Sequence, residues 1–133
     1  MPKPAGQYRI VIFLDVNAGE IKRELEGFSP LVKIVHDGDN FNRLSDRKLL
    51  RRFETMAAKD YRESRVFVLT HDQSFEEGTE FDYQESRIAI IKMPSPSLGQ
   101  FLFEQAVADL KSFLNLFLSL GRPTKLHGIF HIE

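Results

Sequence analysis

Two runs of β-branched and aromatic residues, at 8–14 and 65–69, carry charged side chains only near their amino ends. Such runs are typical of strands that are covered on both faces, as in a parallel sheet. Further strand patterns lie at 31–35, 87–92 and 126–132, and segments of helical spacing lie at 18–28, 45–61 and 98–120. The alternation predicts an α/β fold, a three-layer α/β/α sandwich in which helices cover both faces of a mostly parallel sheet.

The 133 residues fit one domain, 1–133, because no repeat, low-complexity tract or linker divides them. The commonest small arrangement of such a sheet has the strand order 2-1-3-4-5. Its ligand crevice opens between strands 1 and 3, at their carboxyl ends. We therefore expect a functional site among the residues that follow 8–14 and 65–69.

Composition excludes several kinds of site. The chain has no cysteine, which rules out disulfides, cysteine-based zinc sites, iron–sulfur clusters and a cysteine nucleophile. Its net charge is -1, so any nucleic-acid surface must be a local patch. The apolar run at 8–14 is too short for a signal peptide or a membrane span, and we expect a cytoplasmic protein.

Polar residues follow both of the strands that meet at the expected crevice. Asp15 and Asn17 come after 8–14, and Thr70 and Asp72 come after 65–69. Two carboxylates in one cleft repel each other unless one is protonated or a cation binds, and oxygen ligands suit Mg²⁺ or Mn²⁺. Asp and Asn are also common turn formers at strand ends, so each residue alone has a purely structural interpretation. Asp46 fits either a third ligand or a first-turn acid that favours the helix dipole.

Three short motifs occur in a fixed order along the chain. They are Leu-Asp-Val-Asn at 14–17, Ser-Asp-Arg-Lys-Leu at 45–49 and Thr-His-Asp-Gln-Ser-Phe at 70–75. Together, over roughly residues 8 to 120, they resemble the compact PIN-like family of small ribonuclease-type domains, which are often the toxin of a toxin–antitoxin pair. The resemblance implies an endoribonuclease that depends on Mg²⁺ or Mn²⁺, which would polarise the scissile phosphate and activate a water. It assigns catalytic and metal-ligating roles to Asp15, Asp46 and Asp72, and supporting roles to Asn17, Thr70 and Ser74.

The chain departs from the family pattern at two positions. Ser74 stands where the family has a second aspartate, and Val16 stands where it has an acidic residue. The missing carboxylates weaken a second metal site, and a catalytically degenerate PIN-like interaction domain is therefore an alternative. A receiver-like signalling module is a lower-ranked alternative, since Lys92 precedes Met93-Pro94 but paired acids after the first strand are missing.

Two surfaces suggest partners. Arg43, Arg47, Lys48 and Arg51, with Arg52, form a basic cluster that predicts an RNA-binding patch, although a solvated helix face has the same pattern. The segment 98–120 is more apolar than a one-sided helix requires, with a predicted core-facing stripe that starts at Phe101 and Leu102. This excess predicts either that the helix is nearly all buried or that one side packs against a partner, in a homodimer or by capture of an antitoxin protein.

Overall fold

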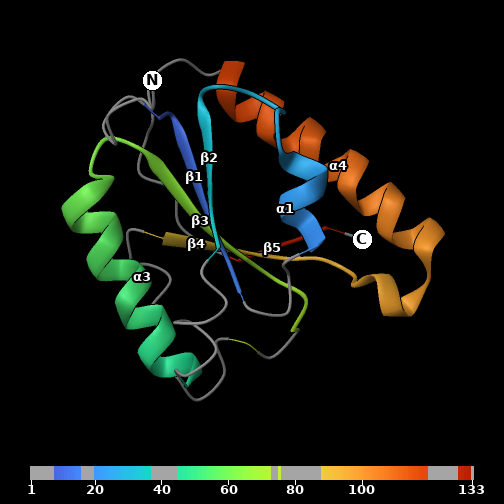
Figure 1. Ribbon diagram of the computed structural model, residues 1–133, viewed down its shortest axis with the longest axis horizontal. Coiled ribbons are helices and arrows are strands. Elements are labelled where there is room, and N and C mark those ends of the chain that lie inside the picture. The colour runs from blue at the N-terminus through green and yellow to red at the C-terminus, as the bar shows by residue number, and fades with distance from the viewer. Residues whose placement is uncertain are drawn as a thin grey trace.

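The computed structural model describes residues 8–15, 20–36, 45–72, 75, 88–119 and 129–132 (Figure 1). Its elements in chain order are β1 (Ile10–Leu14), α1 (Glu20–Leu25), β2 (Val32–Val35), α3 (Asp46–Asp60), β3 (Arg65–Thr70), β4 (Ile88–Lys92), the 3-10 helix η3 (Pro96–Leu98), α4 (Gln100–Ser119) and β5 (Ile129–His131).

The strands form one sheet in the order β2-β1-β3-β4-β5, and every described pairing is parallel. This arrangement confirms the predicted α/β class and the predicted strand order. The chain moves outward from β1 to β2, crosses back to β3 and continues in the opposite direction. The topological switch point therefore lies between β1 and β3, where ligand sites of open α/β sheets are found.

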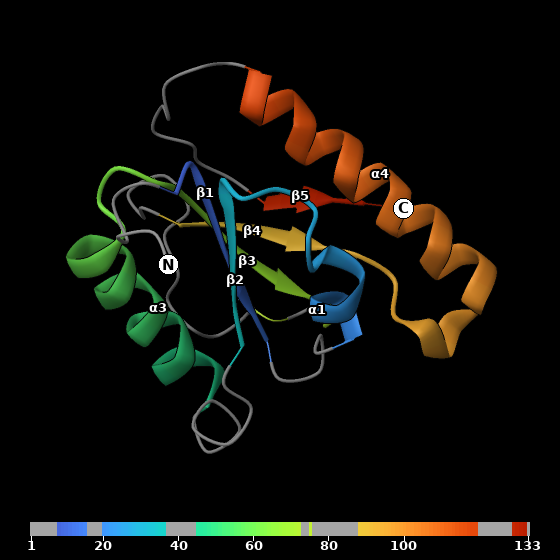
Figure 2. The same ribbon diagram turned by 45° about the horizontal axis from the view of Figure 1, so that its top comes forward.

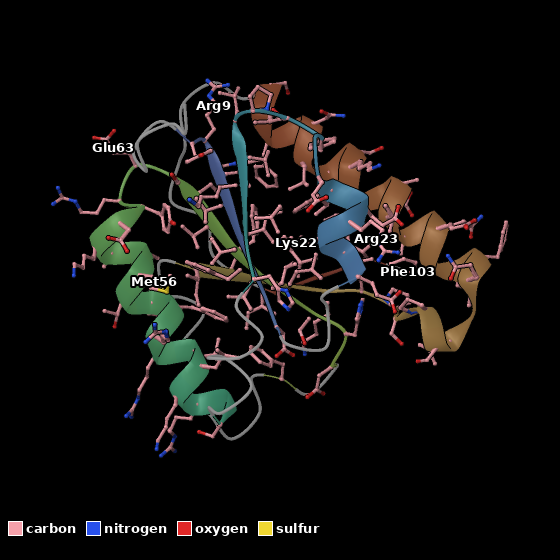
Figure 3. The ribbon with its side chains drawn as sticks, in the orientation of Figure 1. Arg9, Lys22, Arg23, Met56, Glu63 and Phe103 are labelled. Atoms are coloured by element: carbon pink, nitrogen blue, oxygen red, sulfur yellow. The ribbon has the colours of Figure 1, made fainter. Side chains whose placement is uncertain are left out.

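Helices cover both faces of the sheet, as Figures 1 and 2 show. Alternate residues of β1 point to opposite faces. Ile10, Ile12 and Leu14 pack with α1 and α4, whereas Val11 and Phe13 pack with α3. All residues of β1, β3 and β4 are buried, as the predicted double coverage requires. Figure 3 places Met56 of α3 and Phe103 of α4 on opposite sides of the sheet.

Helix α3 begins at the carboxyl edge of the sheet. The Ser45 side chain caps the helix by accepting a hydrogen bond from the Lys48 N–H at 3.4 Å. Along the inner face of the helix, Phe53 is fully buried and stacks on Phe13 of β1, with ring centroids 4.7 Å apart. The first turn of α3, and with it the backbone of Asp46, lies on the side of the molecule at which β1 and β3 end (Figure 1).

Helix α4 departs from the predicted core-facing stripe at its start, whereas the predicted positions Ala106, Leu110 and Leu114 are buried. Phe101 and Leu102 are 70% and 50% exposed, whereas Phe103 is 2% exposed and begins the core-facing stripe. Ala106, Val107, Leu110 and Leu114 continue this stripe. The prediction was wrong at its start because positions 101–103 are all apolar, so helical spacing fits more than one of them. Among the described helices, none combines the length and the apolarity needed to cross a membrane.

Candidate functional site

Three buried polar side chains form a row across the carboxyl edge of the sheet. The Asp15 N–H donates to the Leu69 carbonyl at 3.0 Å, which aligns Asp15 with Thr70, and Thr70 pairs in register with Lys92. Asp15, Thr70 and Lys92 are 4%, 0% and 4% exposed. This Asp15–Thr70–Lys92 row therefore joins the ends of β1, β3 and β4.

The row lies on the α3 face of the sheet. Leu14, Leu69 and Ile91, the residues just before the three members of the row, belong to the core under α1 and α4. Side chains alternate along a strand, so Asp15, Thr70 and Lys92 point to the other face. They continue the columns of apolar residues that pack against α3, and they stand where those columns reach the carboxyl edge.

Thr70 links the two aspartates that follow β1 and β3. Its Oγ1 donates to Asp15 Oδ2 at 2.8 Å and accepts a hydrogen bond from the Asp72 N–H at 3.0 Å. The hydroxyl thereby fixes one oxygen of the Asp15 carboxylate and the backbone of the turn that carries Asp72. Because Thr70 is fully buried, this link holds both acidic residues at the switch point.

The residues around Asp72 anchor the turn after β3. The Phe75 N–H donates to the Asp72 carbonyl at 3.2 Å, and the Phe75 ring is fully buried on the α3 face. The His71 side chain belongs to the opposite side of the sheet, where its Nδ1 lies 3.0 Å from the Met93 carbonyl and its ring contacts Phe103. His71 is therefore not part of the row.

The structure brings together part of the predicted site. Asp15, Thr70 and Asp72 lie at one edge, and the Asp46 backbone begins α3 at that edge. The Asp46 side chain and residues Asn17, Ser74 and Arg43 lie outside the described part of the chain. Arg47, Lys48 and Arg51 are exposed on α3.

A three-residue metal cluster is not found in the described ranges, where no group of three His, Cys, Asp or Glu side chains is positioned to hold an ion. Asp15 and Asp72 are the acidic side chains that these ranges place at the end of β1 and directly after β3. Of these two acidic residues, Asp15 is bonded to Thr70 through its carboxylate and Asp72 through its backbone N–H.

Lys92 is a member of the row that the sequence motifs do not assign to the site. Its sequence signal is its place at the end of a strand, just before Met93-Pro94, which resembles a receiver-like feature. Its position beside Thr70 depends on the register between β3 and β4, which cannot be derived from the sequence.

The fold and the row define a class: an open, parallel α/β domain with acid, hydroxyl and ammonium groups side by side at its carboxyl edge. No family model, curated protein or solved structure matches the chain.

Thr70→Val is expected to destabilise the protein by about 1–3 kcal/mol, because it removes the hydroxyl that bonds to Asp15 and Asp72 in a buried site. Urea unfolding measures the change. Thr55→Val is the matched control, since the Thr55 hydroxyl bonds to the Arg51 carbonyl on the exposed face of α3 and its loss should cost less than about 0.5 kcal/mol. Equal effects of the two substitutions would show that Thr70 does not support the row.

Proposed function

We propose that this chain is a metal-dependent endoribonuclease of the PIN-like type and the toxin of a toxin–antitoxin pair. RNA phosphodiesters are its substrate, and Mg²⁺ or Mn²⁺ is held by Asp15 and Asp72, with Asp46 as the third carboxylate. The observation that carries the proposal is the link between Asp15 and Asp72 through Thr70 at the switch point. Residues from two strands that are far apart in the sequence meet where this fold class binds ligands.

The donor atoms of this edge fit a hard divalent cation. Mg²⁺ prefers oxygen ligands, keeps several of its waters and is commonly bound by one or two carboxylates together with substrate phosphates. Asp15 and Asp72 supply two carboxylates, so a larger protein cage is not required. The bond from Thr70 orients the Asp15 carboxylate, as outer hydrogen bonds do for metal ligands. The bound ion would polarise the scissile phosphate and lower the pKa of an attacking water.

The basic residues of α3 support RNA as the substrate class. Arg47, Lys48 and Arg51 are exposed and occupy the first two turns of α3, the end of the helix that lies at the carboxyl edge. A polyanion held there would be guided to the carboxylates by cations that contact its phosphates. Arg43, just before this helix in the sequence, completes the proposed patch.

Neutralising the patch is expected to weaken RNA binding and its dependence on salt. The triple variant Arg47→Gln, Lys48→Gln, Arg51→Gln should reduce the slope of log affinity against log salt by about 2, since each phosphate contact to a single strand contributes ~0.7. Fluorescence anisotropy with single-stranded RNA measures the slope. Lys22→Gln with Arg23→Gln, on α1 across the sheet (Figure 3), is the control and should leave the slope unchanged. An unchanged slope in the triple variant would exclude this face as the RNA surface.

The surface proposed to bind a protein partner consists of exposed apolar residues of η3 and α4. Leu98, Phe101, Leu102 and Leu116 are 69%, 70%, 50% and 59% exposed. We propose that this surface pairs with a second copy of the chain or with an antitoxin protein, in the cytoplasm.

The second candidate is a receiver-like signalling module, and the buried Lys92 beside Thr70 is the observation that favours it. Stable uptake of a phosphoryl mimic at Asp72 would support it.

A direct cleavage assay tests the proposal. The purified chain is incubated with single-stranded RNA in Mn²⁺, in Mg²⁺ and in a chelator, and an Asp72→Asn preparation made in parallel controls for contaminating nucleases. We expect cleavage only by the unchanged chain and only with metal. Metal-dependent RNA binding without cleavage would instead identify a degenerate interaction domain.

A further inference from the structure

Lys92 is the feature that the proposed nuclease chemistry leaves unexplained. Asp15, Arg65 and Lys92 are the buried charged side chains in the described part of the chain. Arg65 lies at the amino end of β3, where its guanidinium packs 4.4 Å from the centre of the Phe117 ring. The other two flank Thr70 at the carboxyl end. A buried ammonium is costly unless a negative charge compensates it.

Asp15 lies close enough to Lys92 for its carboxylate to compensate the charge of the ammonium. Neighbouring strands lie about 4.8 Å apart, so the Cα atoms of Asp15 and Lys92, two strands apart in register, are separated by roughly 10 Å. Both side chains point to the α3 face, and the long flexible stem of lysine spans much of this distance. Charges interact strongly in a buried site because solvent screens them little.

We propose that Lys92 is the built-in counter-charge of the site. Its ammonium balances the buried Asp15 carboxylate and supplies the positive charge that a second divalent cation would otherwise bring, so the chain binds a single divalent cation. Lys92 is thus a positioning residue that sets the stoichiometry and affinity of metal binding. The metal part of this inference rests on the proposed function, whereas the charge balance does not.

The charge balance is tested without metal, in a chelator, by a double-mutant cycle. Asp15→Asn and Lys92→Met should each destabilise the chain, and the double variant should be more stable than the sum predicts, by at least tenfold in the unfolding equilibrium constant. Arg65→Met is the matched control because it removes a buried cation at the other edge of the sheet, and its effect should add to that of Asp15→Asn. If Lys92→Met does not fold but the double variant does, the coupling is demonstrated.

The stoichiometry is tested by calorimetric titration with Mn²⁺. The unchanged chain should bind one ion. Lys92→Met should bind Mn²⁺ about tenfold more tightly because a neighbouring positive charge is gone, and Arg65→Met should bind as the unchanged chain does. Lys92→Gln gives a second variant with the same expected gain, and Lys92→Arg should restore the original affinity.

The outcomes separate the two proposals. If the effects of Asp15→Asn and Lys92→Met on stability simply add, Lys92 is not the counter-charge of Asp15, whether or not Mn²⁺ binds. A coupled cycle in a chain that binds no Mn²⁺ overturns the proposed metal-dependent function and leaves Lys92 as the counter-charge of Asp15. Two ions bound by the unchanged chain, or unchanged affinity in Lys92→Met and Lys92→Gln, overturn the proposed control of metal binding.

Discussion

Replacing Asp15 with asparagine is expected to lower metal-dependent RNA cleavage by on the order of 100-fold or more, while the chain stays folded. Asparagine keeps an oxygen that can accept the hydrogen bond from Thr70, so the geometry of the edge is preserved. It loses the negative charge that attracts a divalent cation. Since even residues that only orient a metal ligand commonly cost 10–100-fold in affinity or activity, loss of a ligand should cost at least about as much.

The same loss is expected for Asp72→Asn, because Asp72 is the other described carboxylate of the proposed site. Asp109→Asn is the control, since Asp109 is exposed on α4, which covers the opposite face of the sheet. Initial rates at saturating Mn²⁺ compare the three variants. Asp15→Asn and Asp72→Asn that cleave as fast as Asp109→Asn would contradict the assignment of both carboxylates.

Phe53→Ala is expected to destabilise the chain by about 3–5 kcal/mol. Phe53 is fully buried and stacks nearly parallel on Phe13, so its loss opens a cavity between α3 and β1. Phe13 lies on the same face of β1 as Asp15, and α3 closes that face of the sheet. The substitution should therefore loosen the layer that buries the row. A typical domain is stable by only 5–15 kcal/mol, so the effect is large.

Phe101→Ala is the matched control for Phe53→Ala, because the Phe101 side chain is 70% exposed and its loss should change stability by less than about 0.5 kcal/mol. Chemical unfolding of the two variants measures the difference. If they proved equally stable, the core between α3 and the sheet would not be packed as described.

The fold was predictable because its main signals are local. The runs at 8–14 and 65–69 carry few polar groups, and such strands need cover on both faces. Helical segments of sufficient length between strands then favour parallel crossovers and a small set of strand orders. The burial of Phe103 in place of Phe101 was not predictable, because consecutive apolar residues fit the helical period in more than one way.

The part of the candidate site that directly follows β1 and β3 was predictable, because the strand order determines which strand ends are neighbours. Asp15 and Asp72 follow strands that the topology makes neighbours, and the structure links them through Thr70. Lys92 required the register between β3 and β4, together with the knowledge that its face is covered by α3. Both are properties of the packed sheet. A lysine at the end of a strand reads from sequence alone as a solvent-exposed residue.

The central claim is that carboxylates from β1 and from the turn after β3 hold one divalent cation at the switch point. The shift in melting temperature on adding Mn²⁺ tests it most directly, because a ligand that binds only the folded state stabilises it by an amount that rises with the logarithm of its concentration relative to the dissociation constant. We predict that the melting temperature of the unchanged chain rises by several degrees, with stabilisation of about 2.7 kcal/mol at 100 times the dissociation constant. The double variant Asp15→Asn, Asp72→Asn should show no rise. An equal rise in both proteins, or none in either, would contradict the claim.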